Sequence, residues 1–315
     1  MPKIFFSLRP PEGSYGGGAF FVKNMSKYLM EKNYQITYEL EPGIDLIFMI
    51  DPRQGNYKQY GLREMLGYKK QNPKVKILYR VNECDIKRQH SIGLEGLIVT
   101  AISQMDYVVF VSAWLEQYYL KKYHDIYQVN HTYILNGCDQ NIFKPSEEKK
   151  ELGNKIKLVT HHFSCDYKKG FHIYNELDKI LPETNLELTY IGNYHPDYQP
   201  KNIKLEKCDT GESLAEKIRH HDIYLTATQY EPGAMHYLEG ISCGLPLLYC
   251  INGGGAQEVG LHRGEEYHNI PSLLDKIKKI SHNYSEYLNR LNYQEFSSDR
   301  CSEDYFKIIN RLLEI

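Results

Sequence analysis

The chain has 315 residues, which suits two domains of about 150 residues each, and its apolar content allows each half to bury a core. Its 38 Lys and Arg residues nearly balance its 40 Asp and Glu residues, so the net charge of −2 gives no support to nucleic-acid binding as its main task. Seven cysteines without a CxxC pair indicate free thiols in a reducing compartment, and no apolar run approaches the roughly 18 residues of a membrane span.

Short apolar runs alternate with amphipathic segments along the whole chain, which predicts parallel sheets and an α/β fold. The strands expected in the first half are 3–8, 35–39, 46–50, 75–79, 107–112 and 132–135, and the helices are 20–32, 61–70 and 113–123. A polar stretch at 136–154 is the expected linker. The second half repeats the pattern with strands at 157–161, 186–191, 223–228 and 247–251, helices at 171–181, 213–220, 234–243 and 270–282, and a helical tail from 284.

Two carboxylates, Glu231 and Glu239, lie eight residues apart around the expected start of a short helix. Pro232-Gly233 ends the preceding strand, and the helix follows at once. At a rise of about 1.5 Å per residue the two acids are roughly 12 Å apart, which is about the length of a ribose-diphosphate-sugar unit. Amides of a first helical turn favour a diphosphate. The pattern predicts one acid on the ribose and the other on the sugar; a solvated pair on a surface helix is the alternative.

This segment, with Gly240-Ile-Ser-Cys-Gly-Leu-Pro246 after it, resembles the E-x7-E signature of retaining glycosyltransferase family 4. The resemblance covers nearly the whole chain and implies the GT-B fold, in which two Rossmann-like domains with parallel sheets face a central cleft. It implies an N-terminal acceptor-side domain at 1–150, a donor-binding domain at 151–283, and C-terminal helices at 284–315 that pack back on the N-terminal domain. The implied activity is sugar transfer from a nucleotide-diphosphate sugar to a glycan or lipid-linked acceptor, by a metal-independent enzyme of the hexosyltransferase type.

Within this resemblance, Glu231 and Lys169 are the expected catalytic residues. Lys169 matches the family lysine that stabilises the departing diphosphate, Glu231 engages the donor sugar, and Glu239 holds the ribose. Many relatives carry an Arg shortly before that lysine, and this chain has none there. His161, His162 and Ser164 occupy the region instead. Two interpretations stay open for the histidines: a protonated ring beside the phosphates, or a buried ring at the end of a strand.

The remaining donor-binding candidates are positions where backbone amides can approach the ligand. Glycine lacks the Cβ that would block such an approach, although each glycine can equally serve a tight turn. The residues are Gly17, Gly18, Gly192, Gly233, Ala234 and Met235.

On the acceptor side, the polar residues Asn82, Glu83 and Asp85 follow a strand of the first half. A solvated polar loop is the alternative for each of them. Asn136-Gly137-Cys138-Asp139 resembles the family's N-G-x-D linker element, for which we expect a structural role at the domain junction.

The sequence predicts no metal and no cofactor. It contains neither an Asp-x-Asp motif nor a His/Cys cluster at metal-ligand spacing, and a GxGxxG dinucleotide fingerprint is absent. The expected partners are a nucleotide sugar and a glycan or lipid-linked acceptor, without nucleic acid. The N-terminus lacks the apolar region of a signal peptide, so we expect a cytoplasmic location, and peripheral contact with the inner face of a membrane stays open.

Two other functions remain open at this point. One is a non-catalytic nucleotide-sugar binding protein, which the missing Arg favours. The other is a nucleotide-sugar epimerase on the same architecture, which would convert the donor with no acceptor present.

Overall fold

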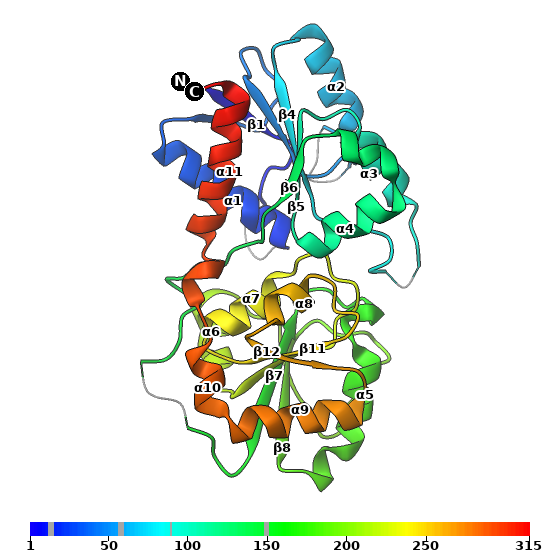
Figure 1. Cartoon of the computed structure of the whole chain (residues 1–315), viewed down its shortest axis with the longest axis vertical. Helices are drawn as coiled ribbons and strands as arrows, with labels where there is room; N and C mark the ends of the chain where they lie inside the picture. Colours follow the sequence, from blue (N-terminus) through cyan, green and yellow to red (C-terminus); the bar gives the residue numbers. More distant parts are fainter. Residues whose placement is uncertain (12–15, 56–59, 89, 148–150) are drawn as a thin grey trace. The chain divides into compact units, whose positions relative to one another are not determined.

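A computed structural model of the chain describes residues 1–11, 16–55, 60–88, 90–147 and 151–315. The chain divides into two compact units, each with its own sheet (Figure 1). Unit 1 comprises Met1–Asp85, Ser91–Asn136 and Ser298–Ile315, and unit 2 comprises Ile86–His90 and Gly137–Ser297. The expected divisions after residues 150 and 283 therefore differ from those of the units. Residues 148–150 of the expected linker lie outside the described residues.

Unit 1 contains a six-stranded parallel sheet in the order β2-β1-β3-β4-β5-β6. The strands are β1 Lys3–Phe6, β2 Gln35–Thr37, β3 Leu46–Met49, β4 Lys76–Val81, β5 Tyr107–Phe110 and β6 His131–Tyr133. The helices are α1 Gly17–Glu31, α2 Leu62–Gln71, α3 Leu94–Ile102, α4 Ala113–Lys122 and α11 Ser298–Leu313, with a 3₁₀ turn, η1, at His124–Gln128. The sequence patterns did not predict α3, and α1 begins three residues earlier than expected.

The last helix of the chain belongs to the core of unit 1. In Figure 1, α11, drawn in red, runs beside α1, drawn in blue. The ring of Tyr305 on α11 lies 4.9 Å from the ring of Phe21 on α1 and 5.5 Å from that of Phe48 on β3. Tyr305 is fully buried. The two ends of the chain therefore share one apolar core.

Unit 2 contains the second six-stranded parallel sheet, in the order β12-β11-β10-β7-β8-β9. Its strands are β7 Ile156–His162, β8 Leu186–Gly192, β9 Lys204–Glu206, β10 Ile223–Thr226, β11 Leu247–Cys250 and β12 Gly264–Tyr267. Its helices are α5 Phe171–Ile180, α6 Gly211–Arg219, α7 Met235–Ser242, α8 Gly255–Gly260, α9 Ile270–His282 and α10 Tyr284–Asn289, with 3₁₀ turns η2 Tyr167–Lys169, η3 Leu181–Glu183 and η4 Tyr293–Phe296. The short elements β9, β12 and α8 were not predicted.

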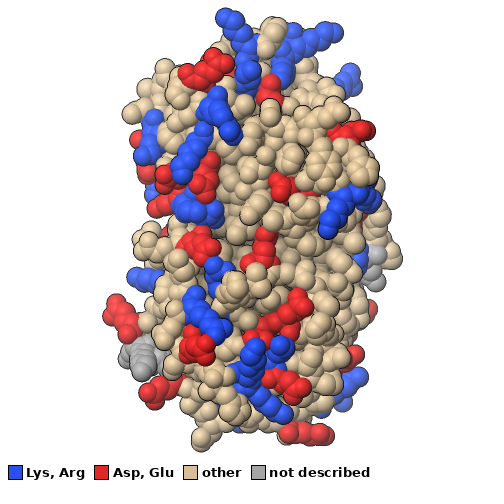
Figure 2. Space-filling view, viewed as in Figure 1, with Lys and Arg blue, Asp and Glu red and all other residues tan. Residues whose placement is uncertain are grey.

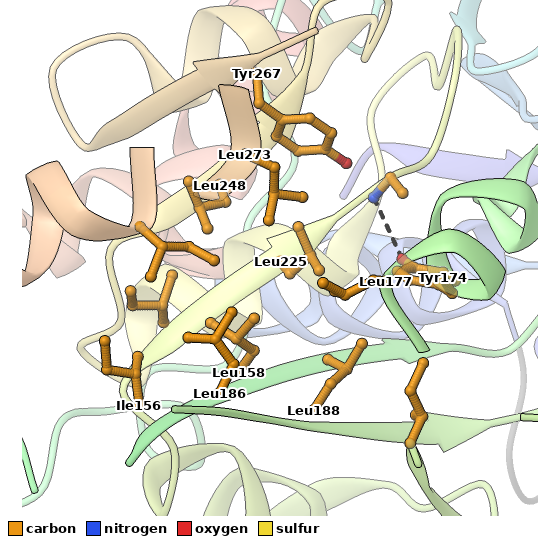
Figure 3. Close-up of a cluster of buried hydrophobic side chains, with 14 of the residues drawn as sticks. Ile156, Leu158, Tyr174, Leu177, Leu186, Leu188, Leu225, Leu248, Tyr267 and Leu273 are labelled. Carbon is orange, nitrogen blue, oxygen red and sulfur yellow. Dashed lines mark hydrogen bonds between the residues drawn. The ribbon is translucent and has the colours of Figure 1, made fainter. Parts of the chain in front are cut away.

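The core of unit 2 explains why its strands read as apolar runs. Leu158 on β7, Leu188 on β8 and Leu225 on β10 point into one cluster, which is closed by Leu273 from α9 (Figure 3). Strands covered on both faces bury nearly every side chain, so they show no alternation of apolar and polar residues. The hydroxyl of Tyr174 on α5 accepts the backbone N–H of Ala227 at 3.3 Å, just beyond the end of β10.

The strand order of unit 2 places a topological switch point between β7 and β10. From β7 the chain proceeds to β8 and β9 on one side, and it then returns to lay β10, β11 and β12 on the other side. In open parallel sheets, ligands bind outside the carboxyl ends of the strands at such a point. The loops after β7 and β10 carry the candidate residues Lys169 and Glu231.

Acidic and basic side chains are interspersed over most of the face shown in Figure 2, in agreement with the balanced composition. Across the described parts of the chain, none of the helices has the length and the apolar character needed to cross a membrane.

Candidate active site

Lys169 and Glu231 form an ion pair in the loops that follow β7 and β10. The Nζ atom of Lys169 donates to Oε2 of Glu231, and the two side chains are 16% and 11% exposed. These are the two residues that the sequence predicts to be catalytic, and the structure brings them into direct contact.

The charge of Glu231 is set by two opposing effects. Burial raises the pKa of this carboxyl group, but the charges of Lys169 and Lys87, with the hydrogen bond from Lys169, outweigh burial and lower the pKa to about 2. Glu231 is therefore ionised at neutral pH and forms a nearly neutral unit with Lys169. An anionic ligand that reaches this pair would compete with Glu231 for the ammonium.

The backbone of Glu231 is held by the glycine-rich turn after β11. Glu231 forms a parallel bridge with Gly254, and its carbonyl accepts the N–H of Gly255 at 2.8 Å. Gly254 has a φ of +71°, and a Cβ there would lie 2.4 Å from the carbonyl oxygen of Glu231. Tyr230 also adopts a left-handed φ of 53°. A non-glycine residue in this region stores strain, which is common beside functional groups.

Glu239, the second acid, pairs with His161 at the end of β7. Oε2 of Glu239 lies 2.7 Å from Nε2 of His161, and the two side chains are 14% and 10% exposed. The hydroxyl of Tyr224 on β10 lies 2.9 Å from Nδ1 of the same ring. The helix that carries Glu239, α7, spans 235–242 and so confirms the expected helix at 234–243 to within one residue at each end.

His162 and His236 are buried neutral histidines. Burial lowers the pKa of each ring well below the usual 6.5, and the charge of Lys169 lowers it further. Nε2 of His162 lies 3.1 Å from the hydroxyls of both Thr160 and Tyr174. Of the two interpretations left open for His162, the structure therefore favours a buried ring at the end of a strand. A protonated ring beside a phosphate would require this burial to be lost.

Two buried polar atoms at these strand ends have no hydrogen-bond partner among the described residues. They are Nδ1 of His162, the last residue of β7, and Oγ1 of Thr228, which follows β10. An unpartnered buried polar atom in a folded protein calls for an explanation, and a bound ligand or water supplies one.

The other donor-side candidates take up backbone positions around this edge of the sheet. Gly192 ends β8 and pairs with His162 in the ladder. Ser164 accepts the N–H of Asp166 at 3.2 Å and so shapes the turn that leads to Lys169.

At the start of α7, the N–H of Ala234 is donated to the hydroxyl of Tyr237 at 3.0 Å. Gly233 and Met235 flank it, and the remaining N–H groups of the first turn have no carbonyl within the helix.

The glycine pair of unit 1 lies in a helix rather than in a loop. Gly17 and Gly18 form the first turn of α1, because Gly16 takes the extended backbone of an N-cap residue at φ −70° and ψ 167°. A Cβ at Gly18 would lie 3.7 Å from the side-chain amide of Asn82, so two of the candidates on unit 1 are close neighbours.

The two acids of the acceptor-side group have different surroundings. The backbone carbonyl of Glu83 accepts the hydroxyl of Tyr119 at 2.9 Å. The carboxylate of Asp85 accepts the hydroxyl of Ser91 at 3.0 Å and the N–H of Leu94 at 3.3 Å, at the start of α3. Asp85 thus serves to begin a helix that the sequence patterns did not predict.

Sequence reasoning missed a group of buried polar side chains in and beside the strands that lead to the site. The hydroxyls of Thr160 and Tyr174 lie 3.1 Å apart, the hydroxyl of Tyr224 accepts the N–H of His161 at 3.1 Å, and the hydroxyl of Thr226 lies 3.0 Å from Nε2 of His236. The sequence did carry a signal for these residues: Thr160 and Thr226 interrupt the apolar strands β7 and β10, and His236 lies in the apolar helix α7. In the described part of the chain, no group of three or more His, Cys, Asp or Glu side chains could hold a metal ion.

Comparison with known proteins shows the fold. No protein-family model matches the chain. Over 223 residues, or 62% of its length, the chain is 23% identical to a probable sucrose-phosphate synthase of Thermosipho melanesiensis, and it spans about half (52%) of the length of that curated relative.

Among solved structures, the sucrose-phosphate synthase of Thermosynechococcus elongatus is similar with a TM-score of 0.77 at 13% identity, with 99% of both chains covered. Anabaena HepE, in complex with UDP and glucose, has a TM-score of 0.69 at 14% identity over 99% of this chain and all of that one. The catalytic domain of starch synthase IV from Arabidopsis thaliana, bound to ADP and acarbose, has a TM-score of 0.71 at 10% identity, with 99% of each chain covered.

The chain has the GT-B fold. These likenesses and the two six-stranded parallel sheets confirm the fold class expected from the sequence.

Proposed function

We propose that the chain is a retaining glycosyltransferase of family 4 that transfers a hexose from a nucleotide-diphosphate sugar to a glycan or lipid-linked acceptor. One observation carries the proposal. At the switch point of unit 2, each acid of the E-x7-E segment is paired with a nitrogen-containing side chain. Glu231 pairs with Lys169 from the loop after β7, and Glu239 pairs with His161 near the end of β7. UDP and ADP in the solved GT-B structures, together with the sucrose-phosphate synthase likeness, support a nucleotide-sugar donor.

In the proposed mechanism the charges of this site are redistributed when the donor binds. Lys169 leaves part of its contact with Glu231 and neutralises the diphosphate, with help from the N–H groups at the start of α7. Glu231, freed on one side, accepts hydroxyls of the donor sugar, while Glu239 accepts those of the ribose. The C–O bond to the diphosphate breaks, the acceptor oxygen attacks from the same face, and its proton passes to the leaving phosphate oxygen.

Charge neutralisation by Lys169 and helix amides leads us to propose that transfer needs no metal ion. Transfer rates measured with and without a strong chelator test this part directly. Equal rates support the proposal, and a loss that added Mg²⁺ or Mn²⁺ restores would contradict it.

The catalytic assignment is tested by Glu231→Gln and Lys169→Ala. We expect each substitution to lower kcat for sugar transfer by roughly 10²- to 10³-fold, because each removes a charge placed at the reacting centre. The assay follows release of the nucleoside diphosphate and appearance of the glycosylated acceptor. Unchanged kcat in both variants would refute the assignment.

The matched control is a surface ion pair in the same unit. Lys155 and Glu187 are 2.8 Å apart and are 62% and 48% exposed. Lys155→Ala and Glu187→Gln should leave kcat unchanged, because an exposed pair contributes little.

Product formation with an acceptor also distinguishes a transferase from the two other functions. A binding protein shows no turnover, and an epimerase converts the donor alone.

A further inference from the structure

The carboxylate of Glu239 is held on one side only. Its Oε2 atom accepts the hydrogen bond from His161 at 2.7 Å. Within the described residues, the other oxygen, Oε1, has no hydrogen-bond partner, although the side chain is only 14% exposed. A carboxylate can accept several hydrogen bonds, so Oε1 of this largely buried side chain remains available as an acceptor.

Both ring nitrogens of His161 have a polar partner, and these two contacts fix the orientation of the ring. The oxygen of Tyr224 accepts the backbone N–H of His161 at 3.1 Å, and this oxygen also lies 2.9 Å from Nδ1 of the ring. Burial raises the pKa of Tyr224 well above its usual 10, so the phenol keeps its proton. A carboxylate oxygen only accepts hydrogen bonds, so the 2.7 Å contact requires a proton on Nε2 of His161, and the contact with Tyr224 at Nδ1 holds the ring in the orientation that points Nε2 at Glu239.

Tyr224 also supports Glu239 through the helix backbone. It is fully buried on β10, and its ring packs directly on Gly240, the residue after Glu239 in α7. A Cβ at Gly240 would lie 2.3 Å from Cδ2 of this ring. The helix can therefore rest on the tyrosine only because residue 240 has no side chain. One buried phenol thus fixes both the imidazole that holds Glu239 and the helix that carries it.

We propose that His161 and Tyr224 are positioning residues that aim the open oxygen of Glu239 at a ribose hydroxyl and thereby select ribonucleotide over deoxyribonucleotide donors. This inference rests on the proposed function for the placement of a ribose at Glu239. A ligand that lacks the hydroxyl leaves an oxygen of this largely buried carboxylate without that partner, which is a basis for discrimination.

The test is the ratio of dissociation constants for deoxy and ribo ligands, measured by calorimetry. The probes are UDP, ADP and GDP, each with its 2′-deoxy and 3′-deoxy form. We expect the wild-type chain to prefer the ribo form of its best ligand by at least about tenfold. His161→Leu and Tyr224→Phe should reduce the ratio to about threefold or less, since the carboxylate is no longer aimed.

A conservative variant and a double-mutant cycle separate positioning from a merely structural role. His161→Gln can still donate to Glu239 and should keep most of the ratio. In a Glu239→Ala background, His161→Leu should change the ratio no further, because its effect passes through the missing acid. The control is His221→Leu. His221 precedes β10, its Nε2 lies 2.9 Å from the hydroxyl of Thr189, and its loss should leave the ratio unchanged.

Three results would overturn the inference while leaving the proposed function in place. The first is equal weakening of ribo and deoxy ligands by His161→Leu and Tyr224→Phe. The second is a His161→Gln variant as impaired as His161→Leu. The third is a wild-type chain that binds nucleotides without discrimination, which would also remove the ribose role of Glu239 from the mechanism but leave sugar transfer untouched. Failure of the wild-type chain to bind any of the three nucleoside diphosphates would overturn both.

Discussion

Among single residues, Glu265 shows how the fold uses a buried carboxylate away from the candidate site. This side chain on β12 is 10% exposed and lies 2.7 Å and 2.6 Å from the ammonium groups of Lys276 and Lys279 on α9. The hydroxyl of Tyr287 on α10 donates to it at 2.5 Å. Burial alone raises its pKa, but these donors outweigh burial and lower the pKa to about 2. Glu265 thus ties two helices to the edge of the sheet.

The lowered pKa predicts a defined loss of stability in acid. The carboxyl group titrates near 4.5 when unfolded and near 2 when folded, so its stabilisation is present above pH 4.5 and is lost as the pH falls toward 2. Glu265→Gln should lower the free energy of unfolding by about 3 kcal/mol at pH 7, and this deficit should shrink between pH 4.5 and 2. Urea unfolding at a series of pH values measures the deficit.

The adjacent acid supplies the control for this prediction. Glu266 lies 3.1 Å from the amide nitrogen of Gln257, away from the lysine pair. Glu266→Gln should change the free energy of unfolding by less than about 0.5 kcal/mol. A deficit for Glu265→Gln that stays constant from pH 7 to pH 2 would show that the carboxylate charge is not the cause.

At the scale of elements, the position of Glu231 depends on contact between the loop after β10 and the loop after β11. Glu231, which precedes α7, is anchored by the turn between β11 and α8, through the bridge to Gly254. This contact fixes where the first acid of the signature lies before any ligand binds. Preorganised groups of this kind avoid the cost of ordering them at the moment of reaction.

Gly254→Ala should therefore affect both stability and activity. Alanine is strained at the φ of +71°, and its Cβ would meet the carbonyl of Glu231. We expect a loss of roughly 3 kcal/mol in the free energy of unfolding and a fall of at least about tenfold in kcat/KM, since Glu231 must move. Urea unfolding and steady-state transfer kinetics measure the two effects.

Gly211→Ala is the control that separates the effect of backbone strain at a positive φ from the effect of a steric clash of the new Cβ. Its φ is +64°, and a Cβ there would have no heavy atom within 4 Å. Gly211→Ala should cost about 1 kcal/mol of stability and leave kcat/KM unchanged. If Gly254→Ala resembled Gly211→Ala in both measurements, the contact with Glu231 would have no functional role.

At the scale of the whole molecule, each of the two units has its own hydrophobic core, which stabilises that unit. Unit 1 includes the last helix of the chain, whose Tyr305 packs against Phe21 and Phe48. The core of unit 2 is built around residues such as Leu225 of β10. Because each core has its own sheet and helices, a substitution in one should affect mainly its own unit.

Two core substitutions test this division. Tyr305→Ala should lower the stability of unit 1 by about 3–5 kcal/mol, and Leu225→Ala should lower that of unit 2 by about 2–5 kcal/mol. Hydrogen exchange followed by mass spectrometry should show faster exchange in β1 and β3 for the first variant and in β7 and β11 for the second. Tyr133→Ala, at a 46% exposed residue of β6, is the control and should change neither. Faster exchange of both sheets in either core variant would contradict the division.

Much of the local structure was predictable, because it depends on short windows of sequence. The alternation of apolar runs and amphipathic segments predicted parallel sheets, and the helix after Pro232-Gly233 was placed to within one residue at each end. Short elements with weak patterns, such as α3, β9 and β12, were missed. β9 and β12 form by pairing with β8 and β11, and α3 begins at hydrogen bonds to Asp85, so none of the three depends on local periodicity alone.

For the candidate site, the sequence by itself determined which residue types stand at the ends of which strands: a lysine after β7, two acids around α7 and a glycine-rich turn after β11. Only the tertiary structure decided which of them meet. The strand order sets β7 beside β10, so Lys169 reaches Glu231 and His161 reaches Glu239 from 62 and 78 residues away. Only that packing makes His162 a buried neutral ring, because desolvation depends on what surrounds a group rather than on its neighbours in the chain.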